Sequence, residues 1–188
     1  MRKKIAVAVG FVLAGIVAIG CGSAGNDTVT PGQANVVASD TEQSAEGPAS
    51  TKIGTPLTLH KDQLGDKLDI TITVSNSKTY TKEPGDYGSK PKNGIFLVVN
   101  VAAQVAAGGT GSYHLNPFNF GFVAGDGTVY DYGSGMLATF PNDLDSADLQ
   151  AGQKKSGTVV FDIKKTDMTG GKISLKGWDS SQIGYWTL

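Results

Sequence analysis

The chain contains a single cysteine, Cys21, and a single arginine, Arg2, among its 188 residues. One cysteine cannot form a disulfide within the chain, so the fold has to depend on a hydrophobic core rather than on covalent cross-links. Proteins that bind nucleic acids or phosphate depend on arginine's planar fork and on net positive charge. Because arginine is almost absent and the formal net charge is -1, we expect no nucleic-acid partner.

The N-terminus has the features of a bacterial export signal. Arg2, Lys3 and Lys4 precede an uncharged apolar run of 15 residues, 5–19. A helix of that length rises about 22 Å, which is less than the roughly 30 Å hydrocarbon core of a bilayer. The segment is therefore typical of a cleaved signal peptide rather than of a membrane-spanning helix.

The apolar run ends in Ala18-Ile19-Gly20-Cys21, which resembles the bacterial lipobox. The resemblance implies cleavage after Gly20, transfer of diacylglycerol to the Cys21 sulfur and acylation of the new amino group. The lipobox prefers leucine at the position of Ala18. Two or three acyl chains attach a protein stably to a membrane. We therefore expect a lipid anchor on the outer face of the cytoplasmic membrane; the alternative is an ordinary secretory signal with Cys21 left free.

Residues 21–51 have the composition of a stalk. Beyond Cys21 they are mostly small or polar, with no aromatic and no basic side chain, and all of their charged side chains are acidic. Such a segment cannot bury enough apolar surface to offset the entropy of ordering it, so we expect disorder. It would span about 30 Å as a random coil and about 100 Å when extended. The predicted organisation is a signal peptide at 1–20, this stalk, and one domain at 52–188.

From residue 52 onward, alternating apolar residues predict short β-strands. In residues 67–75, one face of the predicted strand is apolar and the other is polar, as in a half-buried strand. Residues 95–105 are more apolar and predict a central strand that is covered on both faces for part of its length. Phe118, Phe120 and Phe122 alternate with small or polar residues and predict another strand.

The remaining signals complete an all-β pattern. Asp126-Gly127 predicts a hairpin turn before residues 128–132. Further strands are expected at residues 56–60, 157–163, 172–176 and 183–188. No segment shows sustained helical periodicity. About seven to nine strands separated by Gly, Pro, Asn and Asp clusters predict an immunoglobulin-like antiparallel β-sandwich.

The order of these signals resembles the telokin-like, immunoglobulin-fold domain of many Gram-positive bacterial lipoproteins, which is related to small secreted immunogenic proteins of mycobacteria. The resemblance rests on a strand at residues 95–101, an aromatic hairpin at residues 118–132 and the run at residues 149–162. It covers residues 55–188 and implies the sandwich fold. Its motifs are structural and the family's biochemical role is largely unassigned, so it implies no functional residues. The family often has proline at the position of Ala151.

No catalytic motif is complete in the sequence. Ser75 and Lys78 have the Ser-x-x-Lys spacing of acylating enzymes, but the serine ends a predicted strand and the companion motifs are missing. Ser134 lacks the glycine two residues before the serine that a nucleophile elbow requires. His60 and His114 lie in separate segments, so we expect each to be solvated or hydrogen-bonded rather than part of a triad or zinc site. The sequence predicts a protein that is not an enzyme and has no cofactor.

Residues 142–148 form an acidic cluster. Tested as an EF-hand loop that starts at Asp143, the cluster has Asp148 where glycine is required and Lys154 where the bidentate glutamate belongs. The regular motif fails, so no metal site is predicted, although a non-standard cation site stays an open alternative. The simpler interpretation is a loop in which Asp and Ser side chains cap their own backbone.

The best candidate for recognition is the segment of residues 78–94, which we call the lysine loop. It joins two strong predicted strands, and loops on a rigid sandwich commonly carry recognition. Its lysines and tyrosines would suit an acidic or glycan partner, whereas the simpler interpretation is a solvated hairpin loop. The candidate binding residues are Lys78, Tyr80, Lys82, Tyr87, Lys90 and Lys92. Residues 106–116 form a second, glycine-rich loop, and Trp178, Tyr185 and Trp186 are expected to pack in the core or at an edge.

These observations predict a membrane-anchored, extracytoplasmic lipoprotein whose β-sandwich is a non-catalytic binding module. The expected partners are the membrane, through the lipid on Cys21, and an envelope protein or glycan. One alternative is a structural or sensing accessory of an envelope membrane-protein complex. A metal-dependent hydrolase has less support, because no set of catalytic residues is complete.

Overall fold

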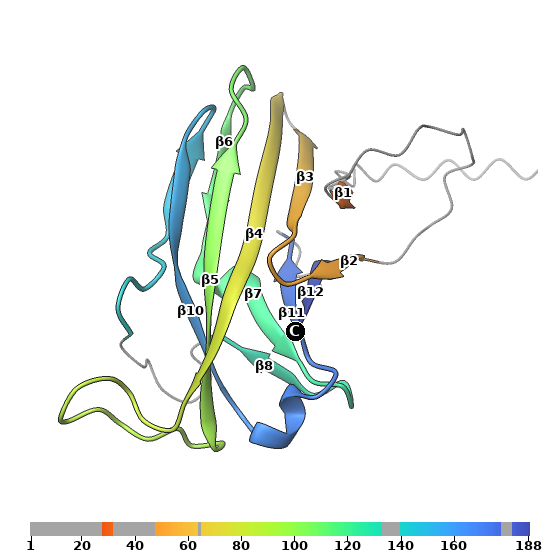
Figure 1. Ribbon diagram of the computed structural model, residues 1–188. Helices are drawn as coiled ribbons and strands as arrows, with labels where there is room; N and C mark the ends of the chain where they lie inside the picture. The colour runs from red at the N-terminus through yellow and green to blue at the C-terminus, as the bar shows by residue number, and fades with distance from the viewer. Residues whose placement is uncertain (1–27, 32–47, 64, 133–139, 178–181) are drawn as a thin grey trace, which may run out of the picture.

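Two five-stranded sheets and one two-stranded sheet make up the domain (Figure 1). The structure, a computed structural model, describes residues 28–31, 48–63, 65–132, 140–177 and 182–188. The expected all-β, immunoglobulin-like sandwich is confirmed. Gly20 and Cys21 lie outside the described residues. Within that described part, no helix has the length and apolar character needed to cross a membrane.

The first sheet has the order β1-β3-β4-β5-β10, and its strand pairs are antiparallel. Its strands are β1 (Thr28–Pro31), β3 (Pro56–Gln63), β4 (Asp66–Tyr80), β5 (Ile95–Val105) and β10 (Lys154–Ile163). Strand β5 is buried on both faces over its first part and alternates afterwards. This burial confirms the expected central strand, because β4 and β10 flank it on either side.

The second sheet has the order β2-β12-β11-β7-β8. Its strands are β2 (Ala49–Lys52), β12 (Gln182–Thr187), β11 (Lys172–Lys176), β7 (Phe120–Val123) and β8 (Val129–Asp131). Strand β2 pairs with β12 in parallel, whereas the other pairs of this sheet are antiparallel. The small third sheet pairs β6 (Ser112–Leu115) with β9 (Ala147–Gln150), and two 3-10 turns lie at Pro117–Asn119 and Lys165–Met168.

The main core lies between the two large sheets. The apolar face predicted for residues 67–75 is buried there as the alternation requires. The second sheet contributes large aromatic residues to the same core, and the most buried of them are Phe120, Phe122 and Trp186. Burial of this apolar surface is the main stabilising contribution to the fold, since the described part of the chain contains no cysteine for a cross-link.

The hairpin predicted at Asp126-Gly127 is present between β7 and β8. Gly127 has φ 90, a conformation that glycine adopts without steric cost. The Ala124 N–H donates to the Thr128 carbonyl O at 2.8 Å, and the Asp126 carboxylate accepts the Thr128 N–H at 2.9 Å. Both bonds close the turn in the way that Asp-Gly hairpins require.

Phe118 does not belong to a strand, and the prediction for it is wrong. The residue lies in the 3-10 turn that Pro117 starts, and the Asn116 side chain caps this turn by accepting the Phe118 N–H at 3.0 Å. Phe118 is 63% exposed and its ring meets Tyr132 edge-on. The proline and the asparagine cap override the alternating pattern, because they favour a turn at this point.

Two strands lie in the segment that the sequence analysis assigned to a disordered stalk. Strand β1 pairs with β3, and β2 pairs with β12, so residues 28–31 and 49–51 belong to the sandwich. Composition could not predict them, because strands added to existing sheet edges are held by backbone hydrogen bonds, which need no apolar side chains. With β6 and β9, which were also missed, the described residues form twelve strands rather than seven to nine.

Candidate functional site

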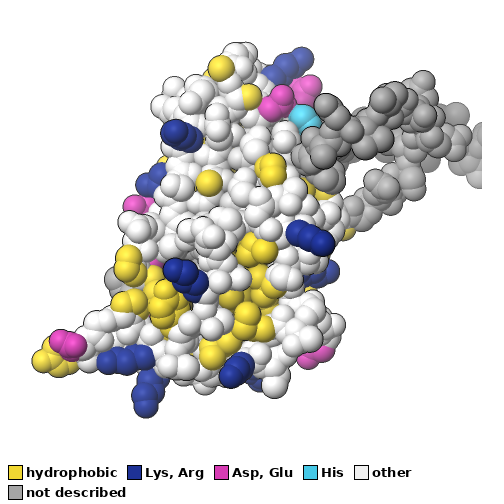
Figure 2. Space-filling model, in the orientation of Figure 1, with side chains coloured by type: hydrophobic (Ala, Val, Ile, Leu, Met, Phe, Trp, Pro, Cys, Tyr) yellow, Lys and Arg dark blue, Asp and Glu magenta, His cyan; other side chains and the backbone are white. Residues whose placement is uncertain are grey.

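The lysine loop connects β4 to β5 and projects from one end of the sandwich, at the lower left of Figures 1 and 2. Strand β4 reaches this end after a bulge between Ser75 and Lys78, where Asn76 has φ 52. A bulge increases the local twist and redirects the strand that carries it. The two central strands of the first sheet therefore support the loop directly.

A buried carboxylate anchors the base of the loop. Asp162, on β10, is only 6% exposed and accepts the Lys92 N–H at 2.7 Å and the Asn93 N–H at 2.9 Å. The Asn93 side-chain amide donates in turn to the Asp162 carbonyl O at 3.0 Å. Hydrogen bonds to a charged acceptor are stronger than neutral ones. Asp162 therefore holds the loop against the first sheet.

A second set of bonds orders the tip of the loop. The Glu83 N–H donates to the Ser89 carbonyl O, and the Glu83 carboxylate accepts the Ser89 N–H, both at 2.9 Å. Gly88 packs against this pair so closely that a Cβ would lie 2.3 Å from the Glu83 carbonyl O. The Lys82 ammonium donates to the Asp86 carbonyl O at 2.8 Å. These hydrogen bonds give the loop a defined conformation.

This shape leaves Tyr87 in solvent with the lysines around it. Tyr87 is 101% exposed, which is exceptional for a large aromatic side chain in an ordered loop. The lysines of the loop are exposed as well: Lys78, Lys82, Lys90 and Lys92. Two acidic residues accompany these four lysines, and one of them, Glu83, is engaged within the loop. Five of the six predicted binding residues are therefore exposed: Lys78 near the end of β4, and the other four on the part of the loop that projects beyond it.

Tyr80 has a different position from the other five. Its ring packs edge-on against Phe140 with the centroids 5.1 Å apart, and Phe140 contacts Phe96 in the same way at 5.6 Å. These residues, with Val98 and Val160, form a small second core on the outer face of the first sheet. Tyr80 supports the base of the loop and is a structural residue rather than a surface contact. Figure 2 shows hydrophobic side chains gathered beside this base.

The acidic residues 142–148 do not converge on a common point. The Asp143 carboxylate accepts a hydrogen bond from the Thr158 hydroxyl at 3.3 Å, and burial raises the pKa of Asp143. Asp145 lies 3.6 Å from the Lys155 ammonium, and Asp148 lies 2.7 Å from the His114 ring. Across the described parts of the chain, no three metal-ligating side chains form a group that could hold an ion. These contacts join the segment to β10 and β6 rather than gathering its carboxylates around one ion.

Both histidines are paired with aspartates across neighbouring strands. His60 Nδ1 lies 2.6 Å from the Asp69 carboxylate, and His114 Nδ1 lies 2.7 Å from Asp148. Each pair occupies directly opposed positions, His60 with Asp69 on β3 and β4, and His114 with Asp148 on β6 and β9. The prediction of hydrogen-bonded histidines is confirmed. Both pairs are exposed, so each is a cross-strand contact on the surface of a sheet.

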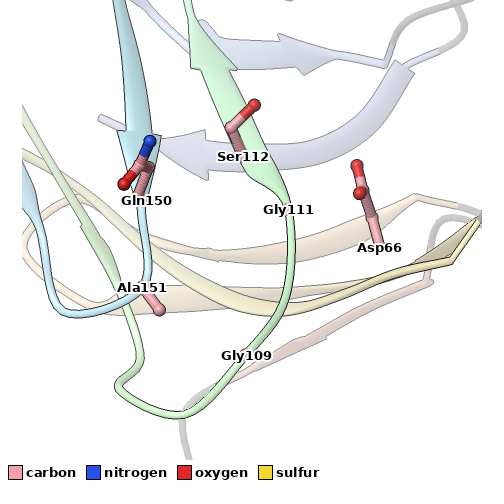
Figure 3. Close-up of a pocket in the computed structure, with 6 residues that line it drawn as sticks. All are labelled: Asp66, Gly109, Gly111, Ser112, Gln150 and Ala151. Carbon is pink, nitrogen blue, oxygen red and sulfur yellow. The ribbon is translucent and has the colours of Figure 1, made fainter.

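An open cavity of about 550 Å³ lies at the end of the sandwich opposite the lysine loop. Figure 3 shows Asp66 and Ser112 on either side of this opening, with Gly109 and Gly111 on the connecting loop. The Lys61 ammonium bridges the two sides by donating to the Asp66 carboxylate at 2.7 Å and to the Ser112 carbonyl O at 3.1 Å. The Asp66 carboxylate at the edge of this cavity is therefore already paired with Lys61.

The aromatic residues near the C-terminus pack as expected where the structure describes them. Trp186 is fully buried, and its indole N–H donates to the Thr55 carbonyl O at 2.9 Å. Tyr185 is half-buried beneath the Lys172 ammonium, which lies 3.9 Å from the ring centroid, and burial raises the pKa of Tyr185. Trp178 and Ser134 lie outside the described residues.

Sequence reasoning missed Asp162, although a signal was present. The residue interrupts the most apolar part of β10, between Phe161 and Ile163, where a charged side chain has to have a partner. Alternation along the strand places it on one face with Thr158 and Val160, and the structure buries it under the lysine loop. The partners could not be found from the sequence, because Lys92 and Asn93 are about 70 residues away along the chain.

Comparison with known proteins supports the fold. The secreted protein MPT63 of Mycobacterium tuberculosis is similar in structure, with a TM-score of 0.58 and 20% identity over 77% of this chain and 100% of that one. The yjhA protein of Bacillus subtilis has a TM-score of 0.48 and 16% identity, over 70% of this chain and 85% of that one. A candidate lipoprotein of B. subtilis, ycdA, has a TM-score of 0.44 and 12% identity, over 68% of this chain and 39% of that one. No curated protein matches the chain significantly.

The similarity to MPT63 confirms the sandwich that the sequence resemblance implied, and at this level of identity it concerns the fold alone. A family model described as "Domain of unknown function (DUF4352)" matches residues 24–176, which is most of the chain. The chain therefore belongs to the DUF4352 family.

Proposed function

We propose that this protein is an extracytoplasmic lipoprotein, anchored through Cys21, whose β-sandwich is a non-catalytic module that binds an acidic partner through the lysine loop. The observation that carries the proposal is the exposure of Tyr87 on a loop held in shape by Asp162 and Glu83. A tyrosine ring combines apolar surface with a polar hydroxyl, and tyrosine is enriched at interaction sites. The exposed lysines of the same loop would attract an acidic partner.

An acidic glycan fits the loop better than a protein surface does. Lysine is depleted at the centres of protein–protein interfaces, whereas tyrosine is enriched there. A site with one exposed tyrosine and four exposed lysines therefore departs from the usual composition of a protein interface. The tyrosine ring can pack on the apolar face of a sugar, and the ammonium groups can pair with carboxylate, phosphate or sulfate groups along a polymer.

The first test is charge removal on the lysine loop. Replacing Lys82, Lys90 and Lys92 with glutamine together should weaken binding to dextran sulfate at low salt by roughly tenfold or more, because each exposed ion pair contributes up to about 1 kcal/mol. The matched control replaces three exposed lysines outside the loop, Lys52, Lys67 and Lys154. Isothermal titration at several salt concentrations measures the effect, which should shrink as salt screens the charges.

Two further probes decide the partner class. Neutral dextran should bind more weakly than dextran sulfate, and poly-glutamate should be intermediate, since it supplies charge without a sugar ring for Tyr87. Equal loss of affinity in the control variant would contradict a site at the loop. Tighter binding of poly-glutamate than of dextran sulfate would favour a protein partner, and crosslinking in cells to a stoichiometric membrane protein would favour an accessory role.

The second test addresses the anchor. The Cys21→Ser variant should move from the membrane fraction to the soluble fraction, because the lipid attachment requires the cysteine sulfur and stable anchoring requires more than one acyl chain. Fractionation and incorporation of labelled fatty acid measure this change. A Gly22→Ala variant, which keeps the sulfur, serves as the control and should stay membrane-bound. Unchanged membrane attachment of a Cys21→Ser protein from which residues 1–20 have been removed would refute the anchor.

A further inference from the structure

Strand β1 attaches the segment next to Cys21 to the body of the domain. Residues 28–31 pair antiparallel with β3, with Thr28 opposite His60 and Pro31 opposite Leu57. Without β1, β3 would be the edge of the first sheet. Proline is tolerated in an edge strand, because one side of the strand has no neighbour to receive an N–H. The family match also begins before β1, at residue 24.

A second attachment follows β1 along the chain. Strand β2 pairs in parallel with β12, so one short strand is added to each large sheet, and β1 contacts both β2 and β12. The two strands lie on the same side of the sandwich (Figure 1). The Ile53 N–H then donates to the Thr187 carbonyl O at 2.9 Å, and the Gly54 N–H donates to the Val74 carbonyl O at 2.7 Å. The N-terminal part of the domain is thus hydrogen-bonded to both large sheets.

The direction of β1 decides which end of the sandwich the tether reaches. Because β1 is antiparallel to β3, its first residue, Thr28, lies at the level of His60, and His60 lies opposite Asp69 near the start of β4. The part of the lysine loop that projects beyond β4, residues 81–94, follows Tyr80, the last residue of β4. A strand rises about 3.3 Å per residue, so Asp69 and Tyr80 are about 36 Å apart along the sandwich. The tether and the lysine loop are therefore at opposite ends.

Attachment of β1 also shortens the tether. Only residues 22–27 separate Cys21 from Thr28, and the seven steps between these two residues span at most about 25 Å. A stalk that stayed free as far as Thr51 could extend to about 100 Å. The short tether limits how far the His60 end can move from the lipid surface.

We infer that the pairing of β1 with β3 orients the anchored domain, with the His60 end next to the membrane and the lysine loop pointing away from it. This inference rests on the proposed anchor at Cys21. It deepens the proposed function, because it places the loop beyond the reach of the headgroups of its own membrane. Its acidic partner is then a polymer of the envelope outside the lipid layer rather than an anionic lipid.

Energy transfer to a labelled lipid tests the orientation. The lipidated protein is placed in phosphatidylcholine vesicles that contain a headgroup-labelled acceptor lipid, with a donor dye on Asp62→Cys or on Tyr87→Cys. Lipidation consumes the Cys21 sulfur, so the introduced thiol is the only reactive one. Both positions are exposed, with Asp62 near the His60 end. Transfer should be about threefold or more higher from position 62, since that end lies closer to the lipid.

A variant that breaks β1 provides the contrast. Backbone N–H groups alternate in direction along a strand, so in the Val29→Pro, Thr30→Pro double variant one proline removes a donor to β3. Energy transfer from positions 62 and 87 to the labelled lipid should then become similar, because the domain is no longer held by a short tether at the His60 end. The matched control exchanges the same residues, Val29→Thr with Thr30→Val, and keeps two β-branched residues in the strand. It should preserve the difference. Equal transfer from both positions in the unmodified strand would show a domain lying flat or reorienting freely, and would overturn the inference.

Hydrogen exchange separates failure of the inference from failure of the anchor. In the Cys21→Ser protein, which needs no membrane, the alternate amides of residues 57–60 in β3 that face β1 should exchange at least about tenfold more slowly than in the double-proline variant, in which Thr28 is the only β1 residue that keeps an N–H. Equal exchange of these β3 amides in the two proteins would overturn the orientation and leave the proposed anchor and lysine loop intact. Protected amides together with a Cys21→Ser protein that stays on membranes would instead refute the anchor, and the orientation with it.

Discussion

Replacing Trp186 with alanine is expected to lower the free energy of unfolding by about 3–5 kcal/mol. Trp186 is the largest of the fully buried side chains, and the surrounding sheets cannot close the space that it fills without distorting their hydrogen bonds. The indole also donates to the Thr55 carbonyl O, which would be left without this partner. Chemical denaturation followed by far-ultraviolet circular dichroism measures the change and avoids using tryptophan emission as the probe.

The Trp186→Phe variant separates packing from the hydrogen bond. Phenylalanine retains most of the apolar ring but has no N–H, so the expected loss is about 1–2 kcal/mol. A matched surface control is Phe118→Ala, because Phe118 is 63% exposed and its loss should cost well under the value for Trp186. If Trp186→Ala unfolds at the same denaturant concentration as the unmodified chain, β12 does not complete the core as described.

Replacing Asp162 with asparagine is expected to release the base of the lysine loop and to lower the free energy of unfolding by about 1.5–3 kcal/mol. The carboxylate accepts two backbone N–H groups, from Lys92 and Asn93. An amide offers a single oxygen, and its NH₂ group would face the second N–H donor. Thermal and chemical unfolding measure the stability change, and binding of dextran sulfate should weaken because the loop loses its shape.

Limited trypsin digestion shows whether the effect is local to the loop. Cleavage after Lys82 and Lys92 should become faster in Asp162→Asn, whereas the bond after Lys90 precedes Pro91 and resists trypsin. The control is Asp145→Asn, which removes an exposed carboxylate 3.6 Å from Lys155 and should cost less than about 1 kcal/mol. Cleavage rates and stability that match those of the control would show that Asp162 does not anchor the loop.

The candidate site could be predicted in part. The pattern of lysines and tyrosines between two strong strands identified the loop, and five of its six named residues are exposed together. Tyr80 was grouped with them because it is adjacent in sequence, but its ring packs on Phe140, which comes from a segment 60 residues later. Neighbours along a strand alternate between environments, so proximity in sequence does not place side chains on one surface.

The sequence by itself determined the all-β class, the extent of the central strand and the Asp-Gly hairpin, because these depend on alternation and turn chemistry within a few residues. Only the tertiary structure decided that Asp162 anchors the lysine loop and that residues 28–31 and 49–52 join the two sheets. The buried carboxylate and the added edge strands are completed by backbone groups far away in the chain. Backbone N–H and C=O groups are present in almost every residue type. Which of them pair is therefore not visible in the amino-acid pattern and is decided only when the sheets assemble.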